Sequence, residues 1–246
     1  MIKRKVILIA SPGDCLADTF LKGVIFDIQN MISFLTSPSG GSWDRSEIQI
    51  LNDPDKTLLL NSINENKNAI DYQLVLYSGH GLFSKENKET VLLINEDEVI
   101  SDKDLIAEGI PKQLIIVDSC RTIIDASFNI YLSENVKQFP SMLTNEDARK
   151  IYDSQIEKCD SGTTIVYSSS IGQVSKDTSI GGLFLNSLFE VTDGWIKAPN
   201  QYTILPISSA VVKTTKHLKS IESEQVPKIK NSLLFPFALR SKEDIV

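Results

Sequence analysis

Two residues with the chemistry of a thiol hydrolase stand where buried strands are expected to end. His80 follows the apolar run Leu74–Tyr77 and lies between glycines, and Cys120 comes shortly after the apolar run Leu114–Val117. Runs of about four apolar residues are typical of strands covered on both faces, and open α/β sheets place their chemistry at the carboxyl ends of such strands. The chain has only two histidines and three cysteines, so one of each in this setting indicates a catalytic pair.

A cysteine nucleophile needs an adjacent imidazole and donors for the oxyanion. We expect Cys120 to attack the scissile carbonyl, with His80 as general base or as the imidazolium of an ion pair. The N–H groups of Gly81 and Cys120 are the predicted oxyanion donors, and loss of one such donor typically lowers turnover by about 10²–10³. Because His80 and Cys120 are forty positions apart, parallel strands joined by a crossover must bring them together. The alternative is a small core cysteine and a polar histidine cap.

The blocks Ser78-Gly79-His80-Gly81 and Asp118-Ser119-Cys120 resemble the histidine and cysteine blocks of the caspase and metacaspase group of cysteine peptidases. The cysteine block is closer to metacaspases, although Arg121-Thr122 follows where they usually carry His-Ser-Gly. Weaker matches are Val6–Ala10, Gly181–Phe184 and Gln225–Pro227. The resemblance implies a small caspase homologue of bacterial type. Its fold would be a three-layer caspase-like α/β fold, with a mostly parallel six-stranded sheet and helices on both faces.

The resemblance also implies where a substrate side chain binds. In metacaspases the aspartate two residues before the nucleophile lines an acidic pocket for arginine or lysine, and Asp118 holds that position. A carboxylate in a partly dry pocket pairs well with guanidinium or ammonium. Asp14 is a candidate second wall of this S1 pocket, and Asp177 is a third. Alternatively, Asp118 only accepts backbone hydrogen bonds, and Arg121 or Lys176 would invert the charge preference.

Composition narrows the function classes. At 246 residues and 41% apolar content, the chain is expected to form one domain over residues 1–246. A net charge of −7 argues against non-specific nucleic-acid binding. No apolar run approaches the roughly 18 residues of a membrane helix, and the apolar stretch near the start is too short for a signal peptide. Three widely spaced cysteines favour a reducing compartment, and the cytoplasm is the simplest expectation.

We expect no resident cofactor or metal, because no Cys/His cluster has zinc-ligand spacing. Calcium, which some metacaspases need, is a possible ligand of the acidic stretch Asn95–Asp104, although this stretch lacks an EF-hand pattern. His217, Cys15 and Cys159 are expected to be bystanders.

Strands that alternate with helices predict a mostly parallel sheet around the two blocks. Besides the histidine and cysteine strands, we expect strands at Val6–Ala10, Glu47–Leu51, Thr163–Tyr167 and Leu233–Leu239, and a hairpin of Thr90–Ile94 with Glu98–Ile100. Helices are expected at Phe20–Leu35, Asp53–Asn66, Ser101–Gly109, Gly182–Thr192 and Pro206–Ile221.

Residues 122–160 carry no strong pattern and occupy the place of the inter-subunit linker of caspases. Lys137, Arg149, Lys150 and Lys158 in this segment are either self-cleavage points or ordinary surface charges.

We therefore expect a cysteine endopeptidase that acts on protein or peptide substrates after basic residues. By analogy, it would be a regulated effector in cell suicide or anti-phage defence, activated by a small molecule, a partner protein or self-cleavage. One alternative is a catalytically silent caspase-fold module that senses a ligand or partner. Another is a thiol hydrolase on a flavodoxin-like sheet that acts on an ester or small amide. The intact His80, Gly81 and Cys120 favour an enzyme over the silent module.

Overall fold

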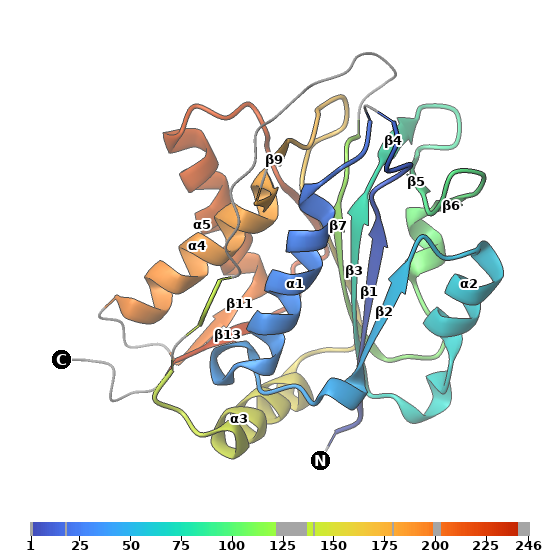
Figure 1. The fold of residues 1–246 in the computed structure, drawn as a ribbon. Coiled ribbons are helices and arrows are strands. Elements are labelled where there is room, and N and C mark those ends of the chain that lie inside the picture. Colours follow the sequence, from blue (N-terminus) through green and yellow to red (C-terminus); the bar gives the residue numbers. More distant parts are fainter. Residues whose placement is uncertain are drawn as a thin grey trace.

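The central sheet positions both catalytic blocks. A computed structural model describes residues 2–17, 19–121, 137–139, 141–178, 180–198 and 203–240. Within them, six strands pair in the order β12-β8-β7-β3-β1-β2 (Figure 1). All neighbours are parallel except β12, which runs antiparallel to β8. The strands are β1 (Arg4–Ser11), β2 (Ile48–Asn52), β3 (Tyr72–Gly79), β7 (Lys112–Asp118), β8 (Gly162–Tyr167) and β12 (Lys228–Lys230).

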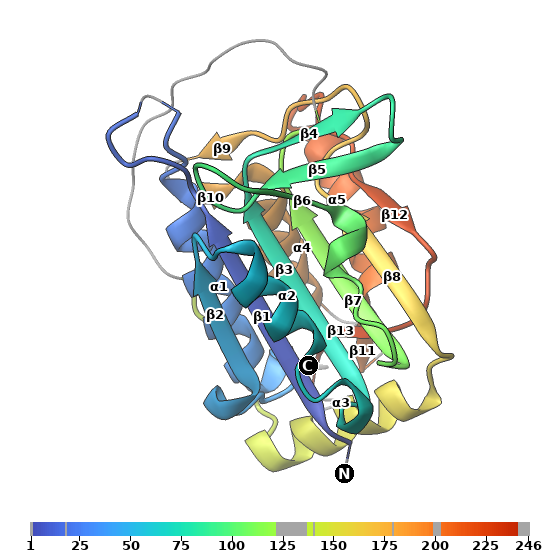
Figure 2. The ribbon, with the colours of Figure 1, turned by 90° about the vertical axis from the view of Figure 1, so that its right-hand side faces the viewer.

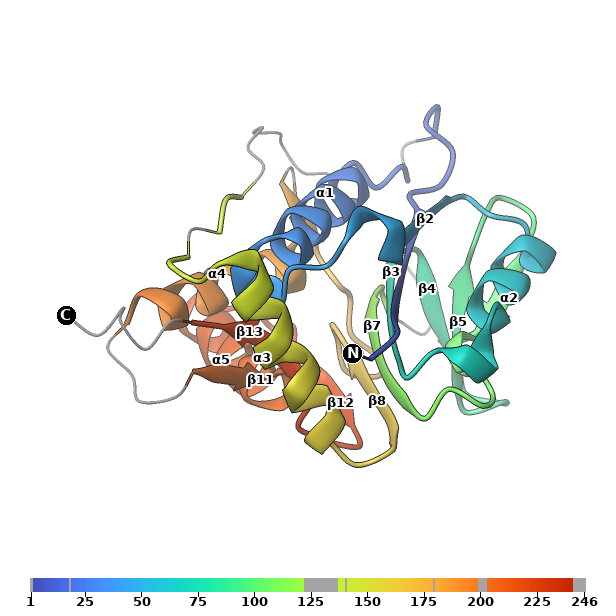
Figure 3. The same ribbon diagram turned by 90° about the horizontal axis from the view of Figure 1, so that it is seen from below.

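Layers of unequal size cover the two faces of the sheet, as Figures 1 and 2 show. One face carries the helices α1 (Gly23–Thr36), α4 (Leu183–Lys197) and α5 (Ile207–Ser220), with α3 (Asn145–Lys158) across its lower end (Figure 3). The other carries α2 (Lys56–Asn64) and a small antiparallel sheet of β4 (Gly81–Ser84), β5 (Glu89–Leu93) and β6 (Val99–Ser101). The expected three-layer fold with helices on both faces is confirmed.

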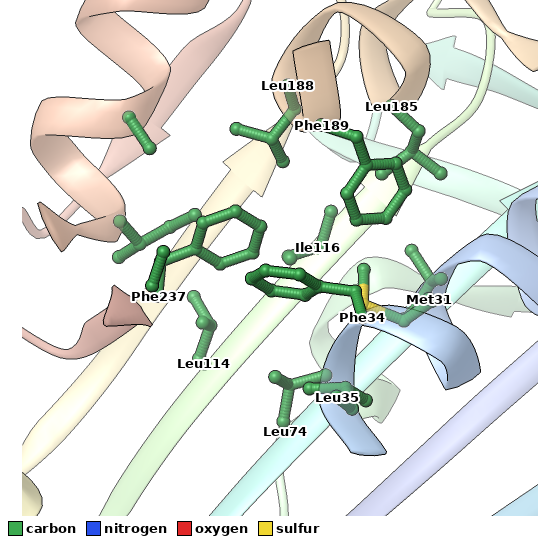
Figure 4. Close-up of a cluster of buried hydrophobic side chains, with 14 of the residues drawn as sticks. Met31, Phe34, Leu35, Leu74, Leu114, Ile116, Leu185, Leu188, Phe189 and Phe237 are labelled. Atoms are coloured by element: carbon green, nitrogen blue, oxygen red, sulfur yellow. The ribbon is translucent and has the colours of Figure 1, made fainter. Parts of the chain in front are cut away.

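An aromatic cluster joins the helical layer to the sheet (Figure 4). The Phe34 ring of α1 lies 4.9 Å from the Phe237 ring and 5.6 Å from the Phe189 ring of α4, measured between centroids. These rings pack over Leu114 and Ile116, which β7 directs to this face of the sheet. Tilted aromatic pairs at this spacing add to the free energy of burial, and they fix α1 and α4 against the catalytic strands.

Two predicted helix boundaries differ from the structure. The second helix begins at Lys56 rather than at Asp53, because Asp55 supplies the cap by accepting a hydrogen bond from the Leu58 N–H at 2.7 Å. The predicted capping box at Ser101 forms, but it opens a single 3-10 turn over Asp102–Leu105 rather than a helix to residue 109.

Helix α3 occupies part of the segment in which we expected no regular structure. Its buried apolar residues Ala148, Tyr152 and Ile156 recur every fourth position in an otherwise polar stretch, which gives a weak sequence signal. Arg149 and Lys150 lie within this helix, and the Arg149 guanidinium bonds Glu47 at 2.6 Å. The expected unstructured linker is therefore wrong for these residues. Residues 122–136 lie outside the described residues.

The last predicted strand does not join the central sheet. β13 (Pro236–Leu239) pairs antiparallel with β11 (Ile204–Pro206) in a separate two-stranded sheet. All four β13 residues are buried in the helical layer. The sixth strand of the central sheet is β12, whose single apolar residue, Ile229, stands between two lysines and gives no strand signal. The sheet edge on this side is therefore β12.

A buried ion network fixes the amino-terminal end of β1. The Arg4 guanidinium is fully buried, pairs with Asp153 at 2.9 Å and Glu47 at 3.3 Å, and lies 4.0 Å from the centre of the Trp43 ring. This network ties β1 to α3 and to the loop before β2. In the described part of the chain, no helix has the length and apolar character needed to cross a membrane.

Removing one partner of this network is expected to destabilise the protein. Asp153→Ala leaves the buried Arg4 charge with Glu47 as its only carboxylate partner, and breaking buried pairs typically costs about 3 kcal/mol. Urea unfolding monitored by tryptophan fluorescence measures the loss. Lys150→Ala, which removes an exposed ion pair of the same helix, serves as the control and should leave the unfolding midpoint unchanged. Equal midpoints for both variants would contradict a stabilising role for the network.

Candidate active site

Parallel pairing brings the two catalytic blocks to one edge of the sheet. β3 pairs with β7 in a register that ends with Ser78 opposite Asp118, so His80 and Cys120 each follow two residues after this last pair. Gly81 completes the approach, because a methyl group on it would lie 2.7 Å from the Ser119 Oγ and 3.0 Å from the Cys120 carbonyl oxygen. Only glycine allows the two backbones to come this close.

Backbone groups hold the half-buried imidazole of His80. Its Nε2 lies 2.9 Å from the carbonyl oxygen of Thr19, and because a carbonyl only accepts, Nε2 carries the proton and Nδ1 is left as the base. Burial lowers the pKa of His80, an effect opposed by the carbonyls of Thr19 and Pro12. The His80 carbonyl accepts hydrogen bonds from the Tyr77 hydroxyl at 2.6 Å and the Leu93 N–H at 3.0 Å. Sequence reasoning assigned no group to orient this ring.

The Cys120 thiol is protonated in this structure. Its Sγ donates to the Ser175 carbonyl oxygen at 3.4 Å. Burial raises the pKa of the thiol, and the charges of Asp118 and Asp177 raise it further. Within the described residues, thiol and imidazole are not hydrogen-bonded to each other. The lowered pKa of His80 and the raised pKa of Cys120 both favour the neutral forms. Of the two roles expected for His80, a neutral base in the resting state therefore fits better than a preformed ion pair.

The antiparallel ladder between β4 and β5 leaves one predicted oxyanion donor available. The Leu93 N–H donates to the His80 carbonyl, which makes Gly81 and Leu92 a non-hydrogen-bonded pair. The N–H of Gly81 consequently points away from β5. Its use as an oxyanion donor stays a prediction.

Three carboxylates surround the space beside Cys120. Asp118 is buried at the end of β7, Asp27 is buried on α1, and Asp177 is half-buried in β9 (Asp177–Thr178). Asp27 bonds the Ser78 hydroxyl at 2.7 Å and the Gly182 N–H at 2.8 Å. Burial raises the pKa of Asp118 to about 6 and the pKa of Asp27 well above its ordinary range, and the neighbouring carboxylates contribute.

Asp27 was missed in the sequence, although a signal was present. It shares the apolar face of the predicted amphipathic helix with Val24, Ile28 and Met31. A lone carboxylate on a buried face needs a partner or a function.

The cavity that these carboxylates share is small and partly open to solvent. Its volume is about 30 Å³, roughly the space of one water molecule. The Asp118 Oδ2 is buried without a hydrogen-bond partner, while Oδ1 accepts from the Ser175 hydroxyl at 2.6 Å. The cavity is lined by Leu21, Val24, Asp27, Ser78, Gly79, Asp118, Ser119, Cys120, Ser175, Lys176, Asp177 and Gly182.

The other candidate pocket residues lie apart or at the rim. Asp14 does not line this cavity, and its carboxylate accepts from the nearby Leu16 N–H. Arg121 also lies outside, where its guanidinium packs on Tyr167. Lys176 lines the cavity but is an exposed residue without an ion pair among the described residues.

Three acidic residues of the stretch Asn95–Asp104, where calcium is a predicted ligand, are bonded to protein groups. Glu98 accepts from Asn95 and from the Lys56 N–H, Asp104 caps the Ser101 N–H, and Asp102 bonds Tyr167. No group of three or more histidine, cysteine or acidic side chains in the described residues has metal-binding geometry.

The remaining histidine and thiols lie apart from this site. His217 lies on α5, 3.7 Å from Glu190, Cys15 is exposed, and Cys159 is buried. None of these three residues lines the cavity.

Comparisons with known proteins identify the class of protein to which this chain belongs. The family profile described as Caspase domain matches residues 5–238, and the chain belongs to this family of cysteine-type endopeptidases. The crystal structure of caspase-1 from Spodoptera frugiperda has a similar fold, with a TM-score of 0.61 and 14% identity, covering 98% of this chain and 92% of that one. No curated protein matches the sequence.

Neutralising Asp118 is expected to change how stability depends on pH. Because the folded state raises the pKa of Asp118 to about 6, folding becomes less favourable as the pH rises from about 4 to above 6. Asp118→Asn should therefore be more stable than wild type at about pH 8, by roughly 3 kcal/mol, and the difference should vanish near pH 4. Thermal melts across this range test the prediction, with Asp14→Asn as a control. A constant difference at every pH would contradict it.

Proposed function

We propose that the protein cleaves peptides after arginine or lysine with a His80–Cys120 dyad. The observation that carries this proposal is the cavity beside Cys120, which is walled by Asp27, Asp118 and Asp177 and lacks an arginine. A substrate aspartate would meet three carboxylates there, with the exposed Lys176 as the one cation among the described residues that line the cavity, whereas a guanidinium or ammonium would pair with buried carboxylates.

The geometry supports the following reaction. The unprotonated Nδ1 of His80 takes the proton of the Cys120 thiol, and the thiolate attacks the carbonyl carbon of the scissile bond. The N–H groups of Gly81 and Cys120 stabilise the resulting oxyanion. The imidazolium then protonates the leaving amine, which releases the new amino terminus and leaves an acyl-enzyme. Water, deprotonated by the same imidazole, hydrolyses the thioester and regenerates the thiol.

The burial of Asp118 supports the basic preference most directly. A buried carboxylate is costly unless a cation pairs with it, and a basic substrate side chain would supply that cation. Asp27 lies near Asp118, because a methyl group on Gly182 would contact the Oδ2 atoms of both residues. Two neighbouring carboxylates suit a planar guanidinium with several donors.

The narrow cavity supports a regulated enzyme. A volume of about 30 Å³ does not admit a lysine or arginine side chain, and the thiol and imidazole are each bonded to backbone carbonyls. We infer that a small molecule, a partner protein or self-cleavage widens the site. An effector role in cell suicide or anti-phage defence, and a cytoplasmic location, rest on the resemblance alone. The same narrow state also favours the alternative of a catalytically silent sensing module.

A panel of fluorogenic peptides that differ only in the P1 residue tests the proposal. Wild type should cleave after arginine and lysine, and not after aspartate or alanine. Cys120→Ala and His80→Ala should each lower turnover by at least about 10³, since the dyad acts as a unit. Cleavage after aspartate would overturn the basic preference. Silence of wild type, both alone and with extracts of stressed cells, would favour the sensing module.

The pocket assignment has its own test. Asp118→Asn and Asp177→Asn should lower kcat/KM for P1-arginine peptides by about tenfold or more, the loss expected when a charge-assisted bond becomes neutral. Asp14→Asn should stay within about twofold of wild type, because its carboxylate does not line the cavity. A larger effect of Asp14→Asn than of Asp118→Asn would instead assign the S1 pocket to Asp14, in the loop after β1.

A further inference from the structure

We propose that Arg121 is a positioning residue that sets the geometry between His80 and Cys120. The inference rests on the proposed dyad, but it arises from a different part of the site. Its basis is the set of contacts that the Arg121 side chain makes on the side of the sheet away from the acidic cavity.

Strand pairing alone does not fix the two catalytic side chains. The ladder between β3 and β7 ends at Ser78 and Asp118, two residues before His80 and Cys120. Beyond that point no ladder hydrogen bond joins the two segments in the described part of the chain, and His80 leads into β4. A further link between them is needed, because reacting groups must be held within a fraction of an ångström for efficient catalysis.

The buried Arg121 side chain supplies such a link. Its Nε donates to the Thr90 Oγ1 of β5 at 3.0 Å, and one terminal nitrogen donates to the Ser169 carbonyl at 3.3 Å. Its guanidinium lies 4.0 Å from the centre of the Tyr167 ring at the end of β8. The Arg121 backbone is also anchored, since its N–H donates to the Gln173 carbonyl at 3.0 Å. The residue next to the nucleophile is thus bonded on several sides.

Thr90 connects this anchor to the histidine. β5 holds Thr90 near one end and Leu93 at the other, and the Leu93 N–H donates to the His80 carbonyl at 3.0 Å. β5 also pairs with β4, which begins directly after His80. The connection therefore runs from Cys120 through the Arg121 guanidinium to Thr90, and along β5 to His80.

A second buried pair holds the far side of this connection. Asp102 accepts from the Tyr167 hydroxyl at 2.5 Å and from the Thr90 N–H at 3.3 Å. The Asp102 carboxylate thereby joins Tyr167, whose ring the Arg121 guanidinium contacts, to Thr90, whose hydroxyl accepts from Arg121. The guanidinium fork is suited to this place, because it stacks on a ring and donates in its own plane, which a lysine ammonium cannot do.

The test compares substitutions at both ends of the contact. Thr90→Val removes the hydroxyl that accepts from Arg121 and keeps the shape of the side chain, whereas Thr90→Ser keeps the hydroxyl. Thr90→Val and Arg121→Met should each lower kcat for a P1-arginine peptide by about tenfold to a hundredfold, with KM within about twofold, while Thr90→Ser stays close to wild type. The double variant Arg121→Met/Thr90→Val should be no worse than Arg121→Met alone, because both changes break one link.

A second measurement does not depend on turnover. The chain has two histidines, so selective isotope labelling gives two imidazole signals in NMR spectra, with His217 as an internal reference. Thr90→Val should shift or broaden the His80 signal and leave His217 unchanged, while Thr90→Ser leaves both unchanged. This readout separates the inference from the proposed function, because it applies even if wild type and Cys120→Ala are equally silent toward peptides.

Three results would overturn the positioning role. One is a Thr90→Val protein whose His80 signal matches wild type. Another is a pair of substitutions whose effects on kcat per folded molecule multiply. A loss confined to melting temperature, with kcat of the folded fraction unchanged, would show that Arg121 only stabilises the fold.

Discussion

Parallel pairing between β3 and β7 is the constraint on which the rest of the site depends. The register sets Ser78 opposite Asp118, and both strands leave the sheet at one edge. A shift of one residue would exchange the faces to which all side chains of a strand point, and would send Asp118 away from Asp27 and the cavity. The buried apolar runs of both strands resist such a shift, because each face packs against its own core cluster. The catalytic geometry is therefore a consequence of core packing.

The acidic cavity places unfavourable electrostatics where a substrate can relieve them. Burial raises the pKa of both Asp27 and Asp118, the charge of Asp118 raises the pKa of Asp27 further, and the charge of Asp177 raises both. Hydroxyls of Ser78 and Ser175 and the N–H of Gly182 offset part of this cost. A basic P1 side chain would supply a positive charge and lower both pKa values, so binding of a cation and ionisation of the cluster would be linked.

The predictable parts of the molecule are those in which a local pattern and a tertiary role coincide. His80 and Cys120 were located because apolar runs precede them, and Asp118 because it ends one of those runs. Asp27 was missed because its helix was read for its apolar face alone. α3 escaped notice because its core contacts are few and widely spaced. β12 exists through its pairing with β8 rather than through its own composition, so no local pattern predicts it.

The short segment of residues 175–177 contacts both the Cys120 thiol and the acidic cavity. The Ser175 carbonyl accepts a hydrogen bond from the Cys120 thiol, and the Ser175 hydroxyl donates one to Asp118. Asp177, which follows two residues later, lines the cavity. Gln225 holds the segment in place by donating to the Ser175 hydroxyl at 3.0 Å and accepting from the Lys176 N–H at 3.3 Å. A displacement of residues 175–177 would free the thiol and widen the cavity together. In the proposed enzyme, widening of the pocket and release of the nucleophile would therefore be one structural event, which would tie the acquisition of activity to the admission of a substrate.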